Sequence, residues 1–476
     1  MNKRKWIWRG IIALIVLYAV FAGISRHVYM NRLARDVRYG TREAKIAAAK
    51  QLMKRDRLYD KLQAMPESVR ISAVDAIEEI PGELTVKQCL ILLKDAEESV
   101  RVRVTEALTV LGEDHIELLV PALKDSDGNV RKGAADALVG IGPKVIPYVQ
   151  PAVKESQMRV AAGDALARVG EPSVPALVEL LKDDDQDVRM AAAYSLGKIG
   201  SKKGTPALLK ATGDVAAVRR VAISALCEIC DPESIDLLVE VLTGTGDDGE
   251  VRARAARALS VIEGERAIAI LSGALGDLDL KVRSSVITGL QRIGAPAVKP
   301  VFRAMSTGSA DVRRAGAKVL SAINSAESAS VLLRLVRDSD PAVRASAASG
   351  LGKQTTPVPS SALVPLLSDD GGRVAEEAAV SLICMGRRAV PSLISALRSA
   401  ESNVVKYRAA DVLGKIGSPA VPALLGLLGK DVDTTRWAAY ALGQTGDPRA
   451  KAALEKLETA NDPDLARIVE QALGRL

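Results

Sequence analysis

A pattern of about 31 residues recurs from Val69 to the C-terminus of this 476-residue chain. Its clearest copy, residues 187–200, reads Asp-Val-Arg-Met-Ala-Ala-Ala-Tyr-Ser-Leu-Gly-Lys-Ile-Gly. Copies align on an anchor residue, usually followed by Arg, and in most cases on a Leu eight positions later. The fourteen anchors are Val69, Val100, Val130, Met158, Val188, Val218, Val251, Val282, Val312, Val343, Val374, Val405, Thr434 and Leu465. Such a period indicates stacked units, because one short helix pair cannot bury its own apolar face.

Each unit is predicted to be two helices joined by a turn. Around Val188, Pro175 opens the first helix, aspartates at 183–185 form the turn, and a second helix follows. Val188, Ala192 and Leu196, spaced four residues apart, form the apolar face of the second helix. The predicted fold is all-α: a right-handed α-solenoid of about 14 helical hairpins, preceded by an N-terminal hydrophobic helix.

The predicted organisation has five segments, and the irregular one interrupts the repeats. In that segment Pro357 and Pro359 replace the start of a helix. The next unit has Gly371 and Gly372, and Ala375 where Arg is expected. A missing Arg beside a stiff loop indicates a hinge or a docking point. The segments are 1–26, a membrane anchor or signal sequence; 27–60, a basic helical stalk with a degenerate first repeat at 41–53 as one interpretation; 61–352, the first part of the solenoid; 353–373, the break; and 374–476, the second part with a C-terminal cap.

The N-terminus has the pattern of a membrane anchor or a signal peptide. Four cations precede an uncharged run from Gly10 to Ser25, which is 16 residues or about 24 Å of helix, slightly short of a hydrocarbon core of about 30 Å. Interfacial Trp6 and Trp8 can extend it, and the cleavage signal is mediocre, so an uncleaved single-pass anchor through residues 7–25 is favoured over a signal peptide. The short cationic tail favours an extracytoplasmic solenoid, although basic residues flank both ends of the run. The basic stretch after Arg26 is either a solvated stalk or a surface for anionic lipid headgroups.

The positive charge is concentrated in this flank. The chain has a net charge of +7, but residues 1–60 hold 14 Lys and Arg against 4 Asp and Glu. The other 416 residues hold 51 against 54, so the solenoid lacks the basic groove that nucleic acid requires. Cys227 and Cys230 form a Cys-x-x-Cys, which we interpret as packing residues because the strand-then-helix setting of a redox motif is absent. No cofactor and no metal site are predicted.

The motif Asp-Val-Arg-x-x-Ala-Ala-x-Ala-Leu-Gly-x-Ile-Gly, followed by Ala-Val-Pro-Ala-Leu, resembles the HEAT-like repeat named after the phycobiliprotein (PBS) lyases. The resemblance covers roughly residues 60–476 and implies an armadillo-like helical solenoid. Such solenoids serve as scaffolds and adaptors and rarely as enzymes. In resembling repeats the Arg after the anchor pairs with acidic turn residues of an adjacent unit, so a structural ladder is expected. Its members here are Arg70, Arg101, Arg131, Arg189, Arg219, Arg252, Arg283, Arg313 and Arg344.

One related enzyme family, the deoxyhypusine hydroxylases, binds iron on HEAT-like repeats through His-Glu pairs after the Val-Arg. The corresponding positions here hold no histidine, and the chain has only His27 and His115. That site therefore cannot form, and no other catalytic constellation is visible. The positions hold Met190-Ala191, Arg220-Val221, Ser284-Ser285 and Glu376-Glu377.

Function is expected on the positions two, six and ten residues after each anchor, which we call the stripe. If the anchors face inward, the stripe is exposed, and its residues differ from unit to unit. Residues 61–180 hold 13 Lys and Arg against 19 Asp and Glu, and residues 181–360 hold 24 against 21, a polarity that would orient a partner. Ordinary solvated variation is the alternative, and Trp437 with its neighbouring tyrosines is either a binding hot spot or a capping core. The candidate partner-binding residues are Met190, Tyr194, Lys198, Arg220, Arg314, Lys318, Tyr407, Arg436 and Tyr440.

The sequence therefore predicts a membrane-tethered scaffold or adaptor for protein partners, without enzymatic activity. The alternative is an enzyme accessory or phycobilin-lyase-like module, because that is what the name of the repeat suggests.

Overall fold

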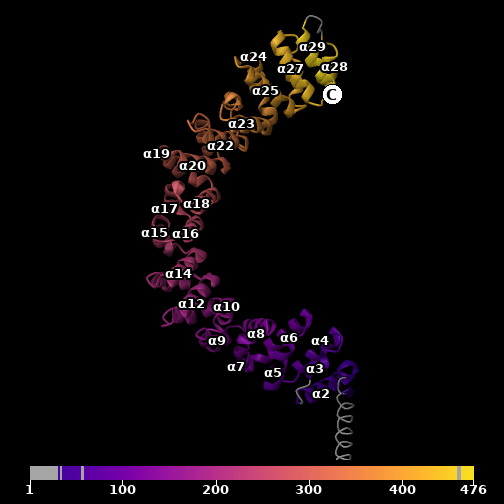
Figure 1. The fold of residues 1–476 in the computed structure, drawn as a ribbon, viewed down its shortest axis with the longest axis vertical. Coiled ribbons are helices and arrows are strands. Elements are labelled where there is room, and N and C mark those ends of the chain that lie inside the picture. Colours follow the sequence, from indigo (N-terminus) through magenta and orange to yellow (C-terminus); the bar gives the residue numbers. More distant parts are fainter. Residues whose placement is uncertain (1–30, 33–34, 55–57, 458–461) are drawn as a thin grey trace, which may run out of the picture. The chain divides into compact units, whose positions relative to one another are not determined.

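The computed structural model describes residues 31–32, 35–54, 58–457 and 462–476, and within these residues every regular element is a helix (Figure 1). The predicted hydrophobic N-terminal helix lies outside the described residues. The chain divides into two compact units, residues 1–229 and 230–476, which are described separately.

The first unit is a stack of helical hairpins in two layers (Figure 1). The second helices of consecutive hairpins pack side by side, and so do most of the first helices. The second helices are α4 (Glu67–Glu78), α6 (Glu98–Leu111), α8 (Gly128–Ile141), α10 (Arg159–Val169), α12 (Gln186–Ile199) and α14 (Ala216–Ile229). The first helices are α3 (Leu58–Leu62), α5 (Glu83–Leu92), α7 (Ile116–Leu119) with η2 (Val120–Lys124), α9 (Ile146–Ala152), α11 (Val174–Leu180) and α13 (Thr205–Ala211).

The second unit repeats this arrangement, again with consecutive second helices in contact. Its second helices are α16 (Gly249–Ile262), α18 (Leu280–Ile293), α20 (Ala310–Ala322), α22 (Pro341–Gly352), α23 (Gly372–Met385), α25 (Asn403–Ile416), α27 (Val432–Gln444) and α29 (Pro463–Leu473). Its first helices are α15 (Ile235–Thr243), α17 (Gly264–Gly273), α19 (Val298–Thr307), α21 (Ala326–Leu335), α24 (Val390–Ser399), α26 (Val421–Leu425) and α28 (Pro448–Leu454).

The anchors explain why the stack holds together. A second helix is present at every one of the fourteen anchors, and twelve anchors are buried, while Val69 and Val312 are half-buried. In thirteen of these helices the anchor is the third residue; α10 instead begins one residue after Met158. The chain thus confirms the all-helical repeat fold that the period predicts.

Local signals in the sequence set the ends of these helices. The Asp185 side chain accepts a hydrogen bond from the backbone N–H of Asp187 at 2.8 Å and so caps α12. Pro175 lies in the first turn of α11, where its missing N–H costs nothing. Gly200 ends α12 with a left-handed φ of 70°, and Cys230 adopts the same region with a φ of 52° at the corresponding place. Cys230 therefore stands in for a helix-ending glycine, and Cys227 is buried.

The stretch at 41–53 also forms a helix, α2 (Arg42–Met53), capped by Thr41. It packs against α4 and buries Ala48, Ala49 and Leu52, as a second helix of a leading unit would. In the first unit, the row of second helices thus begins with α2, one helix before α4.

The irregular segment at 353–373 replaces a first helix with two short 3-10 helices, η9 (Ser360–Ala362) and η10 (Pro365–Ser368). Helices α22 and α23 nevertheless pack directly across it, and Ser381 donates a hydrogen bond to the carbonyl oxygen of Ala348 at 2.8 Å. The buried Gln354 side chain donates to the carbonyl of Ile323 at 2.9 Å. The division into compact units falls between Ile229 and Cys230, not at this segment.

Among the described residues, no single helix is long and apolar enough to cross a membrane. One bent pair, α23 with its 3-10 extension and α24, passes the same criteria of length and composition, with a bend of 115°. The two helices belong to consecutive hairpins of the stack, and their apolar side chains Leu382, Leu393 and Leu397 are buried. The predicted anchor at residues 7–25 lies outside the described residues.

Candidate partner-binding surface

The second helices expose the stripe. Tyr194 and Lys198 project from α12 and Arg220 from α14, all exposed, and Met190 is half-buried beside them. In the second unit, Arg314 and Lys318 of α20 and Tyr407 of α25 are exposed, and Arg436 and Tyr440 of α27 are half-buried. The candidate residues therefore all reach solvent at least in part, while the anchors point into the stack.

The arginines after the anchors connect neighbouring hairpins. In five of the nine predicted rungs, the guanidinium pairs with the aspartate 25 residues later, in the turn of the next hairpin. Arg344, for example, donates to both carboxylate oxygens of Asp369, at 2.7 and 2.8 Å, and also to the carbonyl oxygens of Asp338 and Ser339 in the turn before its own helix. Arg344 thus ties its own turn to the next one. The five pairs are Arg70–Asp95, Arg189–Asp214, Arg252–Asp277, Arg313–Asp338 and Arg344–Asp369.

Where the acidic turn residue comes one position earlier, it pairs with a lysine instead of with the ladder arginine. Arg101 and Arg131 are followed by an acid 24 residues later, and the structure shows both donating to carbonyl oxygens of the turn before their own helix. The acids pair instead with lysines of the preceding turns. These pairs are Lys94–Asp125 at 3.9 Å and Lys124–Glu155 at 3.1 Å. Arg219 and Arg283 likewise donate to carbonyl oxygens, of Thr212 and of Asp277 and Leu278 respectively.

Because the ladder consists of ion pairs, we expect the stability of the stack to fall in acid. Hydrogen bonds from Arg189 and Arg344 lower the pKa values of Asp214 and Asp369 below the ordinary value of 3.8. A carboxyl whose pKa is lower in the folded state stabilises the fold above its unfolded pKa and loses this contribution as the pH falls through the folded pKa. The free energy of unfolding should be flat from pH 7 to about pH 5 and fall below about pH 4. Urea titrations at several pH values would measure this, and the double variant Asp214→Asn, Asp369→Asn should show a shallower slope.

Two candidate cations are already paired within the stack. Arg314 contacts a carboxylate oxygen of Asp340 at 2.7 Å, and Arg436 donates to both carboxylate oxygens of Asp462, at 2.6 and 3.0 Å. Within the described part of the chain, Arg220 and Lys318 have no carboxylate at ion-pair distance. The side chains available to a partner's carboxylates are therefore Arg220 and Lys318 rather than Arg314 and Arg436.

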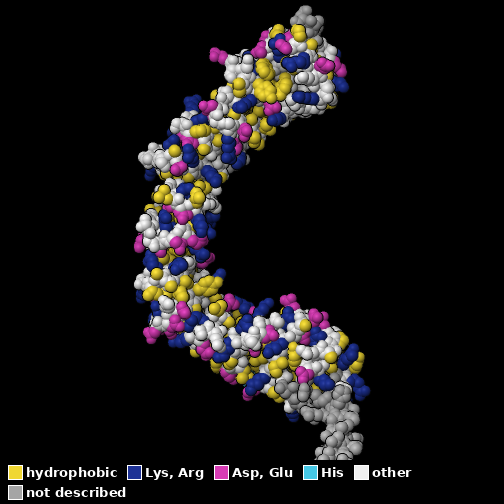
Figure 2. Space-filling model, in the orientation of Figure 1, with side chains coloured by type: hydrophobic (Ala, Val, Ile, Leu, Met, Phe, Trp, Pro, Cys, Tyr) yellow, Lys and Arg dark blue, Asp and Glu magenta, His cyan; other side chains and the backbone are white. Residues whose placement is uncertain are grey.

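The aromatic cluster joins α25 to α27. The ring centroid of Tyr407 lies 6.3 Å from that of Trp437 and 5.6 Å from that of Tyr440. Tyr407 is nevertheless 48% exposed, and hydrophobic side chains gather over these two helices in Figure 2. Burial and the neighbouring Tyr407 hydroxyl raise the pKa of Tyr440. The cluster thus packs two helices together and still leaves an aromatic face in solvent.

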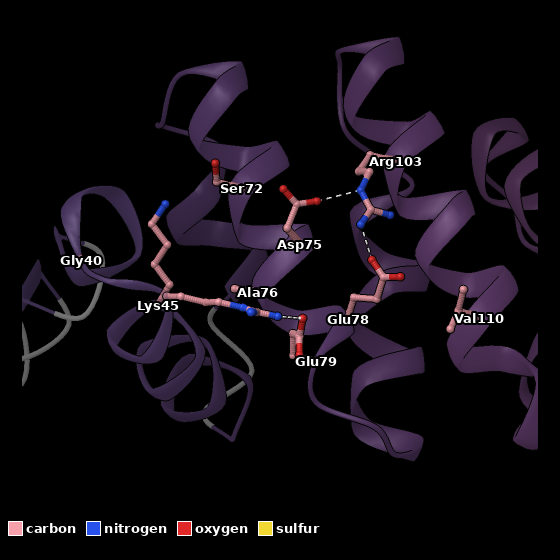
Figure 3. Close-up of a pocket in the computed structure, with 10 residues that line it drawn as sticks. Gly40, Lys45, Ser72, Asp75, Ala76, Glu78, Glu79, Arg103 and Val110 are labelled. Atoms are coloured by element: carbon pink, nitrogen blue, oxygen red, sulfur yellow. Dashed lines mark hydrogen bonds and ion pairs between the residues drawn. The ribbon is translucent and has the colours of Figure 1, made fainter.

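Two of the hollows on the second helices of the first unit exceed 600 Å³. The larger is a groove with a cavity volume of about 790 Å³ over α8, α10 and α12, and Met190 and Tyr194 line it. The other, of about 630 Å³, is polar and lies between α2, α4 and α6 (Figure 3). In Figure 3, Arg103 pairs with Asp75, at 2.7 Å, and with Glu78. Arg42 of α2 pairs with Glu79. The charges of the polar hollow largely satisfy one another, whereas the groove is mostly apolar.

Among the described residues, no three or more His, Cys, Asp or Glu side chains lie close enough together to hold a metal ion. The positions that correspond to the iron-binding His-Glu pairs are no exception. Glu376 is exposed and Glu377 half-buried on α23, and His115 lies half-buried in the loop before α7. His27 lies outside the described residues.

This chain is similar over part of its length to an enzyme and over most of its length to solved structures. A deoxyhypusine hydroxylase from Candida albicans is 31% identical over 120 residues, which are 25% of this chain and 38% of that enzyme. The chain thus spans well under half the length of this relative. Among solved structures, Kap121p bound to RanGTP matches with a TM-score of 0.47 and 14% identity, covering 94% of this chain and 56% of Kap121p. Kap121p bound to Pho4p matches with a TM-score of 0.46 and 14% identity over 94% and 57% of the two chains.

The family model of HEAT repeats matches this chain seven times. Together the matches cover far more than half of the sequence and include all but the first hairpins of the stack. They span residues 86–158, 153–216, 213–291, 235–321, 272–339, 304–383 and 390–474. With its buried anchors and stacked hairpins, the chain belongs to the family of HEAT-repeat proteins.

Proposed function

We propose that this chain is a non-enzymatic scaffold that binds a protein partner through the stripe on its second helices. The observation that carries the proposal is the contrast between two sets of positions on the same helices. The anchors are nearly uniform and buried, whereas stripe residues such as Tyr194, Arg220 and Lys318 are exposed and differ from unit to unit. A binding surface built on repeats varies in this way because each unit contacts a different part of the partner.

Site-specific photo-crosslinking tests the proposal. A photoreactive residue at Tyr194 or Lys318 should capture one protein in stoichiometric yield from intact membranes. The matched controls are Lys210 of α13 and Arg303 of α19, exposed residues on first helices. Equal capture from both layers would contradict a role for the stripe, and recovery of a bound pigment or other small molecule would favour an accessory or lyase-like module instead.

We further propose that residues 7–25 tether this scaffold to a membrane as a single-pass anchor, with the solenoid on the extracytoplasmic side. The uncharged run from Gly10 to Ser25 and its interfacial tryptophans support this proposal. The full chain should stay in the membrane pellet after alkaline carbonate extraction, and deletion of residues 7–25 should release it. Protease added outside intact cells should digest the repeats, and protection of the repeats would reverse the orientation. The motif also supports the finer assignment to the PBS-lyase type of HEAT-like repeat.

A further inference from the structure

We propose that the groove over α8, α10 and α12 binds a short segment of a protein partner in which apolar side chains stand beside Asp or Glu. This inference rests on the proposed scaffold function and names the chemistry of the partner at one place on the stripe. The groove lies wholly within the first unit.

The groove exists because one unit is short. Anchors elsewhere are at least 29 residues apart, but Val130 and Met158 are separated by 28. As a consequence α10 begins at Arg159, after its anchor, whereas α8 and α12 begin two residues before theirs. The missing first turn of α10 leaves a hollow between its neighbours. The hollow is therefore a feature of the backbone and does not depend on one side-chain conformation.

The groove has small residues at its base and apolar walls. Ala161 and Gly163 of α10 and Ala191 of α12 line it without filling it. Ser195 adds little polarity, because its hydroxyl donates to the carbonyl oxygen of Gly163 at 2.9 Å. Val160 and Tyr194 rise beside this base, 83% and 57% exposed respectively. Hydrophobic side chains gather over α10 and α12 in Figure 2. Two exposed apolar side chains beside a hollow favour the insertion of an apolar side chain from a partner.

The charges around the groove select an acidic partner. The lining carboxylates, Asp136 and Asp164, both lie near Arg168, at 2.7 and 3.9 Å. The lining cations outnumber these two acids; they are Arg131, Lys132, Arg159 and Arg168. Lys132 at the α8 edge is exposed, and no carboxylate of the described residues lies at ion-pair distance from it. Arg131 beside it donates only to carbonyl oxygens of the preceding turn, at 2.7 and 2.9 Å.

The positive charge at this edge follows from the lysine pairs described above. The acid that would face Arg131 comes one residue early, as Glu155, and pairs with Lys124. On α12, beyond the lining residues, the ammonium nitrogen of Lys198 lies 5.4 Å from the centre of the Tyr194 ring. An apolar side chain in the hollow would therefore place neighbouring carboxylates against Lys132 and Arg131.

Selection of random 12-residue peptides displayed on phage against the full chain tests this inference. The enriched sequences should combine Leu, Ile, Phe or Met with Asp or Glu. A synthesised, fluorescein-labelled peptide from the enriched set should lose at least tenfold in affinity to Val160→Glu and to Lys132→Glu. Its binding should also weaken as salt rises, since exposed charges are screened.

Two control variants match these changes away from the groove. Val432→Glu alters a valine that is 58% exposed at the start of α27, and Lys353→Glu reverses a charge on an exposed loop lysine. Both should bind the peptide as the unmodified chain does. Circular dichroism should show the same helix content in all four variants.

Enrichment of basic peptides, or affinities that Val160→Glu and Lys132→Glu leave unchanged, would overturn the inference. If the crosslink from Tyr194 persisted in that case, the scaffold function would stand and only the chemistry assigned to the groove would fall. Loss of both the selection and the crosslinks would overturn the groove and the scaffold function together. Selective binding of a second copy of the chain in place of a peptide would also overturn it.

Discussion

Replacing Asp369 with alanine should lower the free energy of local unfolding around α22 and α23 by about 2–3 kcal/mol, because it removes one partner of a largely buried ion pair. The side chains of Arg344 and Asp369 are only 15% and 10% exposed. Asp369 also accepts a hydrogen bond from the backbone N–H of Gly371 at 3.0 Å, so the same change loosens the turn that starts α23. Arg344 keeps its carbonyl acceptors in the preceding turn, which limits the loss.

The neighbouring residue provides the control. Asp370 is fully exposed and approaches Arg344 only to 3.8 Å, so Asp370→Ala should leave the local stability almost unchanged. Asp369→Asn should fall between the two, since the amide oxygen can still accept from Gly371 but carries no charge. Hydrogen exchange of the α22 and α23 amides is the suitable measurement, because repeat proteins open locally rather than all at once. Equal protection in the Asp369→Ala and Asp370→Ala chains would show that the rung does not hold the stack.

The period of the sequence was sufficient to predict the hairpins, because the same burial problem is solved in the same way in every unit. Val188, Ala192 and Leu196 recur in equivalent form at each anchor, and a helix brings residues at this spacing to one face. The exposure of the stripe followed directly from that geometry. The hydrophobic segment before Arg26 occurs only once in the sequence, so its interpretation as a membrane anchor has no support from repetition.

The charge network was harder to predict than the helices. For seven of the nine ladder arginines, an acid follows 24 or 25 residues later, and this separation decides whether the acid pairs with the arginine or with a lysine. No acid stands at either separation from Arg219 or Arg283. The signal is present in the sequence, since Asp95, Asp214 and Asp369 all follow their arginines by 25 residues. Arg314 was predicted as a partner-binding residue, yet Asp340, 26 residues later, pairs with it. A search at these separations would have distinguished Arg314 from Lys318.

The groove could not be recognised from side-chain types alone. Its lining residues are ordinary stripe and small residues, and what opens the hollow is the start of α10 after Met158 rather than before it. The short spacing of 28 residues was the visible sign. Its consequence depends on whether the missing residues come out of the turn or out of the helix, and a spacing does not specify that.

Replacing Gly197 with alanine should destabilise the first unit by about 1–3 kcal/mol, although alanine is the better helix former. A Cβ at this position would lie 2.8 Å from the Cα atom and 2.9 Å from the Cβ atom of Ala225, closer than these atoms can approach. Helices α12 and α14 would have to separate, and both pack backbone to backbone at this point. The change should therefore show as a lower midpoint of urea unfolding.

The same substitution at Gly273 separates this effect from helix propensity. Gly273 is the last residue of α17, and a Cβ there would meet no atom within 4 Å, so Gly273→Ala should be neutral or stabilising by up to about 1 kcal/mol. Opposite signs for the two alanines would establish that close helix contact, not helix formation, makes glycine necessary at 197. The separation should also reach the groove, because Tyr194 of α12 and Val221 of α14 both line it. Gly197→Ala should thus weaken binding of the selected acidic peptide without altering any side chain that lines the groove, and unchanged stability together with unchanged peptide affinity would contradict this account of how the helices are spaced.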